Sequence, residues 1–281
     1  MTGSILITGC STGIGLHCAM ELRRQGYQVL ATARRAEDVA QLKAAGLEAA
    51  QLDLNSSASI RAGLDWALSR TDGRLDALFN NGAYGQPGAV EDLTRDCLRA
   101  QFETNLFGWV ELTNLVIPIM RRQGQGRIIM NSSVLGLVAM KYRGAYNASK
   151  FALEGITDTY RQELAGSGIA ISLIEPGPIS SAFRRNALLA FKHNIDYRHS
   201  AHSTTYAGVL KRLEGDDTEG STFTLPPDAV CKALRHALES RRPRARYYVT
   251  VPTYLLGYLR RLLPSRWLDR ILTRAADSEN N

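Results

Sequence analysis

A tyrosine and a lysine stand four positions apart in the middle of the chain, Tyr146 and Lys150. On a helix these positions share one face, with Cβ atoms about 5–6 Å apart. A free tyrosine has a pKa of about 10, too high for ready proton exchange at neutral pH. A neighbouring ammonium favours the phenolate and lowers that pKa. The spacing therefore predicts an acid/base pair, although helix surfaces often carry it by chance.

A serine strengthens this interpretation, because Ser133 comes 13 residues before the tyrosine, at the end of an expected strand. Its hydroxyl could donate to a carbonyl oxygen while Tyr146 supplies the proton. The neighbouring Ser132 is the competitor, and only its spacing separates the two.

A glycine-rich loop follows the first expected strand, and its glycines are Gly9, Gly13 and Gly15. Gly9 permits a tight turn, and the other two let the backbone approach a diphosphate and the helix pack on the strand. The N-terminus of the following helix offers unpaired N–H groups to an anion. We expect the whole loop to bind a dinucleotide: Gly9, Cys10, Ser11, Thr12, Gly13, Ile14 and Gly15. A simple glycine turn is the alternative.

The same segment, Gly9 to Gly13, also fits the G-x-S-x-G pattern of serine hydrolases. A hydrolase needs a histidine on another loop, and the candidates are His193, His199 and His202. No oxyanion-hole segment of the usual glycine-rich type precedes the serine. This makes the hydrolase a remote alternative.

The end of the second expected strand predicts the cofactor. It reads Thr32-Ala33-Arg34-Arg35, and no acid occurs before Glu37. NAD binding favours an acid here, whereas the 2′-phosphate of NADP needs cations. Arg34 can form a fork onto a phosphate, and Ser11 could add a hydroxyl. We expect NADP(H) rather than NAD(H); a solvated arginine pair is the alternative.

Strand-like and helix-like segments alternate along the chain, which requires crossover connections between parallel strands. The sequence predicts an α/β fold: one Rossmann-type doubly wound parallel sheet of about seven strands, flanked by helices. The expected strands are 4–8, 29–32, 48–52, 75–79, 127–131, 169–175 and 246–251, and the expected helices are 14–25, 36–45, 56–70, 93–123 and 146–165. We divide the single domain, 1–281, into a cofactor and catalytic core (4–180), a poorly patterned substrate region (181–227) and a C-terminal part (228–281) with a helix, the last strand and a basic tail.

Composition excludes several classes of protein. The 281 residues carry a net charge of +7 and are 44 % hydrophobic, as in ordinary globular proteins. The four cysteines form no CxxC or Cys/His cluster, so no metal site is expected. The chain begins without a signal-peptide pattern, and we expect it in the cytoplasm.

The positive charge is concentrated in the tail, where nine arginines and one acid lie between Arg241 and Arg274. Nucleic-acid binding is not expected, because the body lacks a basic face. The longest uncharged run in the tail has 13 residues, too few for a membrane span. Its apolar faces either pack on the body or, as a basic amphipathic helix, contact anionic lipid as a peripheral membrane element.

Taken together, these motifs resemble the short-chain dehydrogenase/reductase family. The matching residues span most of 4–180 in the expected order: the loop from Thr8 to Gly15, Asp53-Leu54, Asn80-Asn81-Gly82-Ala83, Asn105, Ser133, Tyr146, Lys150 and Pro176-Gly177. Within the family, the chain is most similar to the branch with 17β-hydroxysteroid dehydrogenases, retinol dehydrogenases and bacterial NADP-dependent aldehyde reductases. This similarity rests on three segments: the start of the glycine loop, the end of the second strand at Arg34, and the tail from Arg260 to Pro264. One departure is Asn81-Gly82-Ala83, where the family usually has alanine before glycine; it leaves open which residue takes a positive φ.

The resemblance implies further roles. Asp53 would bind the adenine amine and Leu54 would flank the ring, while Asn80 and Gly82 would line the ribose. Lys150 would bind the nicotinamide ribose, and Asn105 would hold a water that links Lys150 to solvent. The last predicted cofactor contacts are Pro176, Gly177 and Ile179, at the nicotinamide. Asp53 as a plain turn former and Asn105 as a helix-bending residue are the alternatives.

These observations predict an enzyme that interconverts an apolar aldehyde or ketone and its alcohol by hydride transfer. Ser133, Leu135 and Tyr146 would contact the substrate. Further apolar candidates are Leu137, Val138, Met140, Phe183, Leu188, Leu189 and Phe191, which could instead close the core or form an interface. A redox-sensing NADP-binding protein with little turnover is the second function. We expect a homodimer or homotetramer through Phe102, Leu106, Trp109, Leu112 and Val116, which could equally be core.

Overall fold

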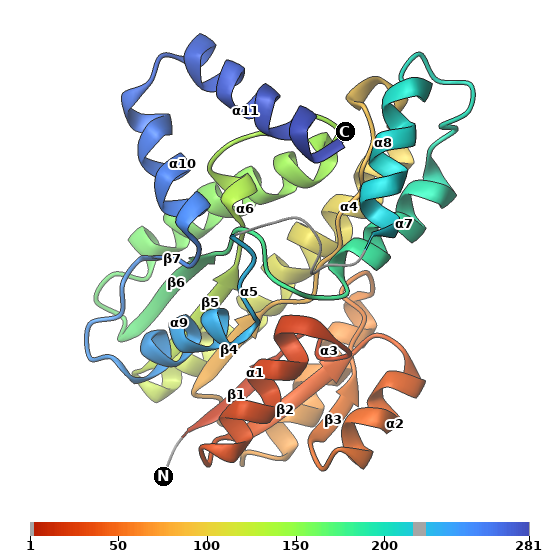
Figure 1. Cartoon of the computed structure of the whole chain (residues 1–281). Coiled ribbons are helices and arrows are strands. Elements are labelled where there is room, and N and C mark those ends of the chain that lie inside the picture. Colours follow the sequence, from red (N-terminus) through yellow and green to blue (C-terminus); the bar gives the residue numbers. More distant parts are fainter. Residues whose placement is uncertain (1–2, 216–222, 281) are drawn as a thin grey trace.

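A computed structural model describes residues 3–215 and 223–280. Its centre is a seven-stranded sheet in the order β3-β2-β1-β4-β5-β6-β7, with every pair parallel (Figure 1). The strands are β1 (Ser4–Ile7), β2 (Gln28–Ala33), β3 (Glu48–Gln51), β4 (Ala77–Asn80), β5 (Gly126–Asn131), β6 (Ile169–Glu175) and β7 (Arg246–Tyr248). This confirms the predicted doubly wound sheet, and all seven carboxyl ends meet at one edge.

Helices cover both faces of the sheet, because its strands are apolar on both sides. In β1, Ile5 and Ile7 pack into one core, while Leu6 between them packs into the other. The first core is closed by α1 (Gly13–Arg24), α2 (Ala36–Ala44) and α9 (Asp228–Glu239). The second is closed by α3 (Ser57–Ser69), α5 (Gly108–Gln123) and α6 (Gly144–Glu163).

The expected helix over 93–123 is interrupted. It consists of α4 (Arg95–Phe102), a π-helical turn η2 (Glu103–Phe107) and α5, after a short η1 (Val90–Asp92). The extra residue of a π turn leaves no mark in an apolar pattern, and such turns often accompany functional sites. Four of the five residues that we considered for a subunit interface are fully packed in this chain's core: Leu106, Trp109, Leu112 and Val116.

The region over 181–227 is more regular than expected. It contains α7 (Phe183–Asn194) and α8 (Ser203–Glu214), which pack together around Phe191, Tyr206 and Val209. Neither helix was predicted, because charged residues interrupt the apolar pattern and neither helix begins with a side-chain cap. Residues 216–222 of the region lie outside the described residues.

The tail forms two helices, α10 (Val251–Leu262) and α11 (Ser265–Asn280), that break at Pro264 as expected. They stand together over α6, and the end of α11 approaches α8 (Figure 1). Leu256, Leu268 and Leu272 pack against Leu135 and its neighbours, near a 3₁₀ turn η3 (Val134–Gly136). No helix over 3–215 and 223–280 has the length and apolarity to cross a bilayer.

Candidate active site

A cleft of about 1000 Å³ opens above the carboxyl edge of the sheet. The loops after β1, β4, β5 and β6 form its floor, and α7, α8, α10 and α11 contribute its walls. In an open parallel sheet, ligands bind outside these strand ends, where the strand order reverses. Here β1 and β4 are neighbours at that reversal.

The glycine loop lies where a diphosphate would need it. Gly9 has a φ of +70°, and a Cβ there would lie 2.4 Å from Gly82 Cα. Thr12 begins α1 without a side-chain cap, and the first turn carries no acid. The N–H groups of that turn are therefore available to an anion. Ser11, Thr12, Gly13 and Ile14 line the cleft, and this backbone cradle fits a dinucleotide.

Two loop residues serve the fold rather than the cleft. Cys10 is buried, its thiol donates to the Ile7 carbonyl, and burial raises its pKa to about 12. Gly15 packs against the Gly9 carbonyl, which a Cβ would meet at 2.2 Å.

The exchanged Gly82-Ala83 order is accommodated without left-handed backbone, because neither residue has a positive φ. Gly82 is small because Gly9 approaches it closely. Thr8 Oγ1 accepts from the N–H groups of Asn81 and Gly82, at 2.9 and 3.0 Å. The Asn81 amide in turn donates to the Thr8 and Gly9 carbonyls, so the two loops are fixed together.

Ser133, Tyr146 and Lys150 come together at the cleft. Ser133 precedes η3, where its Oγ accepts from the Leu135 N–H at 3.1 Å, and it interacts with the Tyr146 hydroxyl. Tyr146 and Lys150 occupy successive turns of α6, and the Lys150 Nζ lies 5.7 Å from the Tyr146 ring centroid. The Tyr146 ring packs edge-on against Phe183 at 5.3 Å.

The pKa values differ from the simple expectation for an amine beside a phenol. Burial raises the pKa of Tyr146 to about 12, and the Ser133 contact and the Arg143 charge oppose this rise only in part. Lys150 does not lower it, because its Nζ turns to the Asn131 carbonyl at 2.7 Å and lies over the Trp109 ring. Burial also lowers the pKa of Lys150 to about 7. The expected lowering of the tyrosine pKa is wrong for the protein in this state.

Asn105 is held by the π turn η2, and its side chain makes three hydrogen bonds. Its Nδ2 donates to the Tyr84 carbonyl at 2.9 Å and to Ser149 Oγ at 3.3 Å, and its Oδ1 accepts from the Tyr84 N–H. The side chain thus ties the loop after β4 to α6. The role of Asn105 in holding a water near Lys150 stays a prediction.

The two arginines after β2 differ in their partners. The Arg35 guanidinium binds both oxygens of Asp38, at 2.9 and 2.7 Å. Arg34 is exposed and, among the described residues, its guanidinium pairs with no acid. Only Arg34 is therefore available to an external phosphate.

Of the other predicted cofactor residues, some line the cleft and others lie outside its lining. Pro176, Gly177 and Ile179 line the cleft, and the Pro176 carbonyl accepts from the Val134 N–H at 2.8 Å. Asp53 Oδ1 accepts from the Asn55 N–H, as a turn former would.

Leu54 and Asn80 lie behind the cleft. A Cβ on Gly82 would lie 3.2 Å from Leu54 Cδ1. Asn80 is fully buried and donates to Thr113 Oγ1. Neither side chain lines the cleft itself.

The expected apolar substrate contacts are partly wrong. Leu135, Met140 and Phe183 line the cleft, whereas Leu188 and Phe191 pack in the core of the α7–α8 pair and Leu189 is exposed. Val138 packs against the tail, and Leu137 lines a different cavity. The tail supplies an apolar wall of the cleft that was not predicted from the sequence: Pro252, Leu256, Ile271 and Leu272. Arg143 and Arg212, also not predicted, line the cleft and pair with Glu279.

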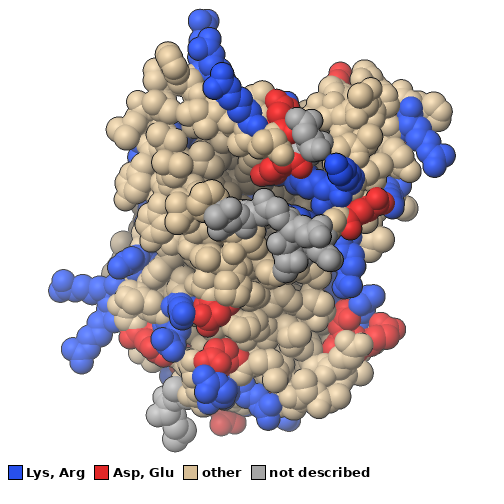
Figure 2. Space-filling model, viewed as in Figure 1, with Lys and Arg blue, Asp and Glu red and all other residues tan. Residues whose placement is uncertain are grey.

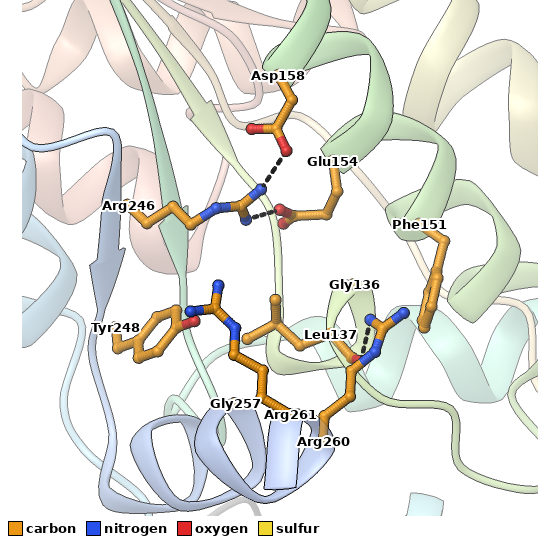
Figure 3. Close-up of a pocket in the computed structure, with 10 residues that line it drawn as sticks. All are labelled: Gly136, Leu137, Phe151, Glu154, Asp158, Arg246, Tyr248, Gly257, Arg260 and Arg261. Atoms are coloured by element: carbon orange, nitrogen blue, oxygen red, sulfur yellow. Dashed lines mark hydrogen bonds and ion pairs between the residues drawn. The ribbon is translucent and has the colours of Figure 1, made fainter. Parts of the chain in front are cut away.

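A charged cluster begins one turn beyond Lys150 on α6, and Figure 3 shows its members Arg246, Glu154 and Asp158. Arg246 of β7 binds Glu154 and Asp158 of α6, and also Glu175 at the end of β6. One guanidinium faces three carboxyl groups here, and burial together with this crowding raises the pKa of Glu154 and raises that of Glu175 to about 8. The cluster fixes the helix that carries Tyr146 and Lys150. The cluster could have been predicted from the sequence, because one helix face carries a polar residue every four positions: Tyr146, Lys150, Glu154 and Asp158.

The family model for short chain dehydrogenases matches residues 4–190. The chain belongs to this family. It is 42 % identical to an uncharacterised oxidoreductase, YbbO of Escherichia coli, over 97 % of this chain and 94 % of that one. It is 40 % identical to human retinol dehydrogenase 8 over 86 % and 80 % of the two chains, in agreement with the expected branch.

Among solved structures, this chain is similar to a short-chain dehydrogenase from Streptomyces avermitilis. The TM-score is 0.74 at 28 % identity, over 99 % of this chain and 96 % of the other. The resemblance stated from the motifs is thus confirmed, and the protein is an oxidoreductase of the short-chain type.

The hydrolase alternative has no support in this family member. No histidine occurs among the described residues that line the cleft bordered by Ser11. His17 lies on α1 and approaches Asp228 instead. Within the described part of the cleft, Ser11 therefore has no histidine to act as its base.

Proposed function

We propose that the protein is an NADP(H)-dependent oxidoreductase that interconverts an apolar aldehyde or ketone and its alcohol. The observation that carries this proposal is the meeting of Ser133, Tyr146 and Lys150 at one cleft, beside an uncapped helix start fit for a diphosphate. A redox sensor would need the dinucleotide cradle alone, and no observation favours that alternative.

The preference for NADP(H) rests on Arg34. Arg34 is exposed at the end of β2, which pairs with β1, the strand before the loop that carries Ser11, while Arg35 is occupied by Asp38. A planar guanidinium forms strong paired hydrogen bonds with a phosphate. The end of β2 offers no free acid of the kind that binds the ribose of NAD.

When bound, the nicotinamide cofactor supplies or accepts the hydride. During reduction, Tyr146 donates its phenolic proton to the carbonyl oxygen, and the Ser133 hydroxyl donates a hydrogen bond to the same oxygen. Burial raises the tyrosine pKa to about 12, so the phenol holds its proton at neutral pH and donates it readily only if a nearby positive charge stabilises the phenolate. Lys150 would take its ammonium form beside an anionic dinucleotide, and in that form it would stabilise the Tyr146 phenolate that remains.

The cleft walls favour an apolar substrate. Leu135, Met140 and Phe183 face the reacting side, and Leu256 and Leu272 extend this surface from the tail. A hydrophobic wall of this kind gains from each buried methylene, at about 0.8 kcal/mol. We expect longer-chain aldehydes to be better substrates than short ones.

We further propose that the enzyme works in the cytoplasm as a homodimer or homotetramer. The outer side of α4 and η2 supports such a contact, because Phe102 and Phe107 form a ring pair there and Phe107 is half exposed.

A kinetic screen tests the function. The purified protein is mixed with NADPH or NADH and a series of straight-chain aldehydes, retinoids and steroids, and the loss of absorbance of the reduced cofactor is followed. We expect turnover with NADPH, and kcat/KM that rises with chain length. Tight NADPH binding without turnover on any carbonyl would favour the sensor instead.

A further inference from the structure

Helix α10 presents its apolar face outward. Val251, Tyr254, Leu255, Tyr258 and Leu262 recur at helical spacing on one side, and their exposed fractions lie between 46 % and 76 %. Scattered exposed leucines need no explanation, but a continuous stripe of five large side chains does. The sequence left open whether this apolar face packs on the body or contacts lipid.

The inward face of α10 shows that this orientation is built into the fold. Thr253 and Gly257 are buried, and a Cβ on Gly257 would meet the Tyr248 ring at 2.9 Å. The Arg260 guanidinium also turns inward, where it donates to the Leu137 carbonyl and stacks on Phe151 at 4.8 Å (Figure 3). Rotating the stripe inward would break these contacts, so the stripe stays on the surface.

Unpaired arginines flank the stripe. The acids near the end of α11 are committed to the body, Asp277 to Lys141 and Glu279 to Arg143 and Arg212. Within the described part of the chain, three arginines of α11 have no carboxylate partner: Arg266, Arg270 and Arg274. Arg261 instead turns into the cavity beside Tyr248 (Figure 3). Figure 2 shows a broad uncharged area over α10, with basic side chains projecting beside it at the top of the molecule.

An aromatic side chain extends this surface onto α11. Trp267 is 59 % exposed, and the Arg270 guanidinium lies 5.5 Å from its ring centroid. Tyrosine, tryptophan, leucine and arginine side by side match the boundary between headgroups and acyl chains of a bilayer.

We propose that α10 and the first half of α11 dock this protein on an anionic phospholipid bilayer. The arginines meet the negatively charged headgroups, and the stripe inserts below them. A second copy of the chain is the less suitable occupant, because a symmetric contact would bring the same unpaired arginines together. This inference does not depend on the proposed reaction.

Docking would place the substrate cleft next to the lipid. The opposite sides of the same helices carry Leu256 and Leu272, which line the cleft. An apolar compound dissolved in the membrane would then reach the cleft along the tail.

Vesicle sedimentation tests the proposal with the full-length protein. Vesicles of pure phosphatidylcholine are compared with vesicles that contain one part phosphatidylglycerol to three parts phosphatidylcholine. We expect at least tenfold tighter partitioning onto the anionic vesicles, and weaker partitioning at high salt. Equal partitioning onto both kinds of vesicle, or none onto the anionic ones, would overturn the proposal.

Matched variants locate the contact. Leu255→Ser with Leu262→Ser should lower the partition coefficient at least tenfold, and Arg266→Glu with Arg270→Glu should do the same. Leu189→Ser on α7, an equally exposed leucine away from the stripe, should leave it unchanged. All of these side chains are exposed, so circular dichroism and NADPH binding should match the wild type. If sedimentation velocity without lipid shows a dimer that the Leu255/Leu262 variant dissociates, the surface binds a second copy and the lipid proposal is wrong.

Discussion

Replacing Arg34 by alanine should weaken NADPH binding and leave NADH binding almost unchanged. The arginine is exposed at the end of β2, where its guanidinium pairs with no acid among the described residues. Its removal therefore exposes no unpaired buried charge, and the change in affinity reports directly on the contact with the cofactor.

The size of the effect follows from the exposure of Arg34. A hydrogen bond to a charged group contributes roughly 1.5–3 kcal/mol when it is well shielded from water. Solvent screening at an exposed site reduces this contribution, so about 1.5 kcal/mol is expected. Each ~1.4 kcal/mol corresponds to a tenfold change, and the Kd for NADPH should rise about tenfold. The Kd for NADH, which lacks the 2′-phosphate, should change less than twofold.

Arg35→Ala is the matched control. This arginine is the next residue along the chain, but the buried carboxylate of Asp38 occupies its guanidinium in an i,i+3 pair. The loss of this pair should lower the stability of the protein, and should leave NADPH affinity within twofold of the wild type.

Fluorescence titration of the three proteins with NADPH and NADH provides the measurement. The reasoning is refuted if Arg34→Ala retains wild-type NADPH affinity, or if Arg35→Ala loses more affinity than Arg34→Ala does.

Three further predictions concern the frame of the site. Gly9→Ala should destabilise the protein by at least about 2 kcal/mol, because the φ of Gly9 is +70° and a Cβ there would meet backbone at 2.4 Å. Gly82→Ala should cost about 1 kcal/mol. Urea unfolding that ranks the two variants in the reverse order would contradict the geometry. Burial and a neighbouring carboxylate raise the folded-state pKa of Glu175 from 4.5 to about 8, so its contribution to stability is full below about pH 4.5 and is lost as the pH rises to about 8. The melting temperature of Glu175→Gln relative to the wild type should therefore increase across this range, and a difference that does not vary with pH would exclude a raised pKa. Burial lowers the pKa of Lys150 from 10.5 to about 7, so folding releases a proton between pH 7 and pH 10.5, and the free energy of unfolding rises with pH over this range. Urea titrations should show that Lys150→Met lacks this rise. A parallel rise in the variant would contradict the lowered pKa.

The sheet could be predicted from the sequence because its signals are local. Short apolar runs such as Ser4–Ile7 end in glycine or a cap and alternate with amphipathic segments, which specifies parallel strands with crossover helices. The same locality made Tyr146 and Lys150 readable, since their spacing alone places them on one face of α6.

What could not be predicted depends on contacts between distant segments. The direction of the Lys150 side chain is set by the Asn131 carbonyl and Trp109, which come from β5 and α5. The tail supplies the cleft with Leu256 and Leu272 from a place far along the chain. Periodicity identified the apolar residues of α10, but only its packing decided which side faces outward.

Tyr146→Phe tests the central claim most directly, because it removes one oxygen atom and keeps the ring against Phe183. With NADPH and the best aldehyde from the screen, the account predicts that kcat falls by a factor of about 10³ or more, while the Kd for NADPH stays within twofold of the wild type. If the variant retains kcat within tenfold of the wild type while it still binds NADPH, Tyr146 is not the proton donor and the proposed mechanism is wrong.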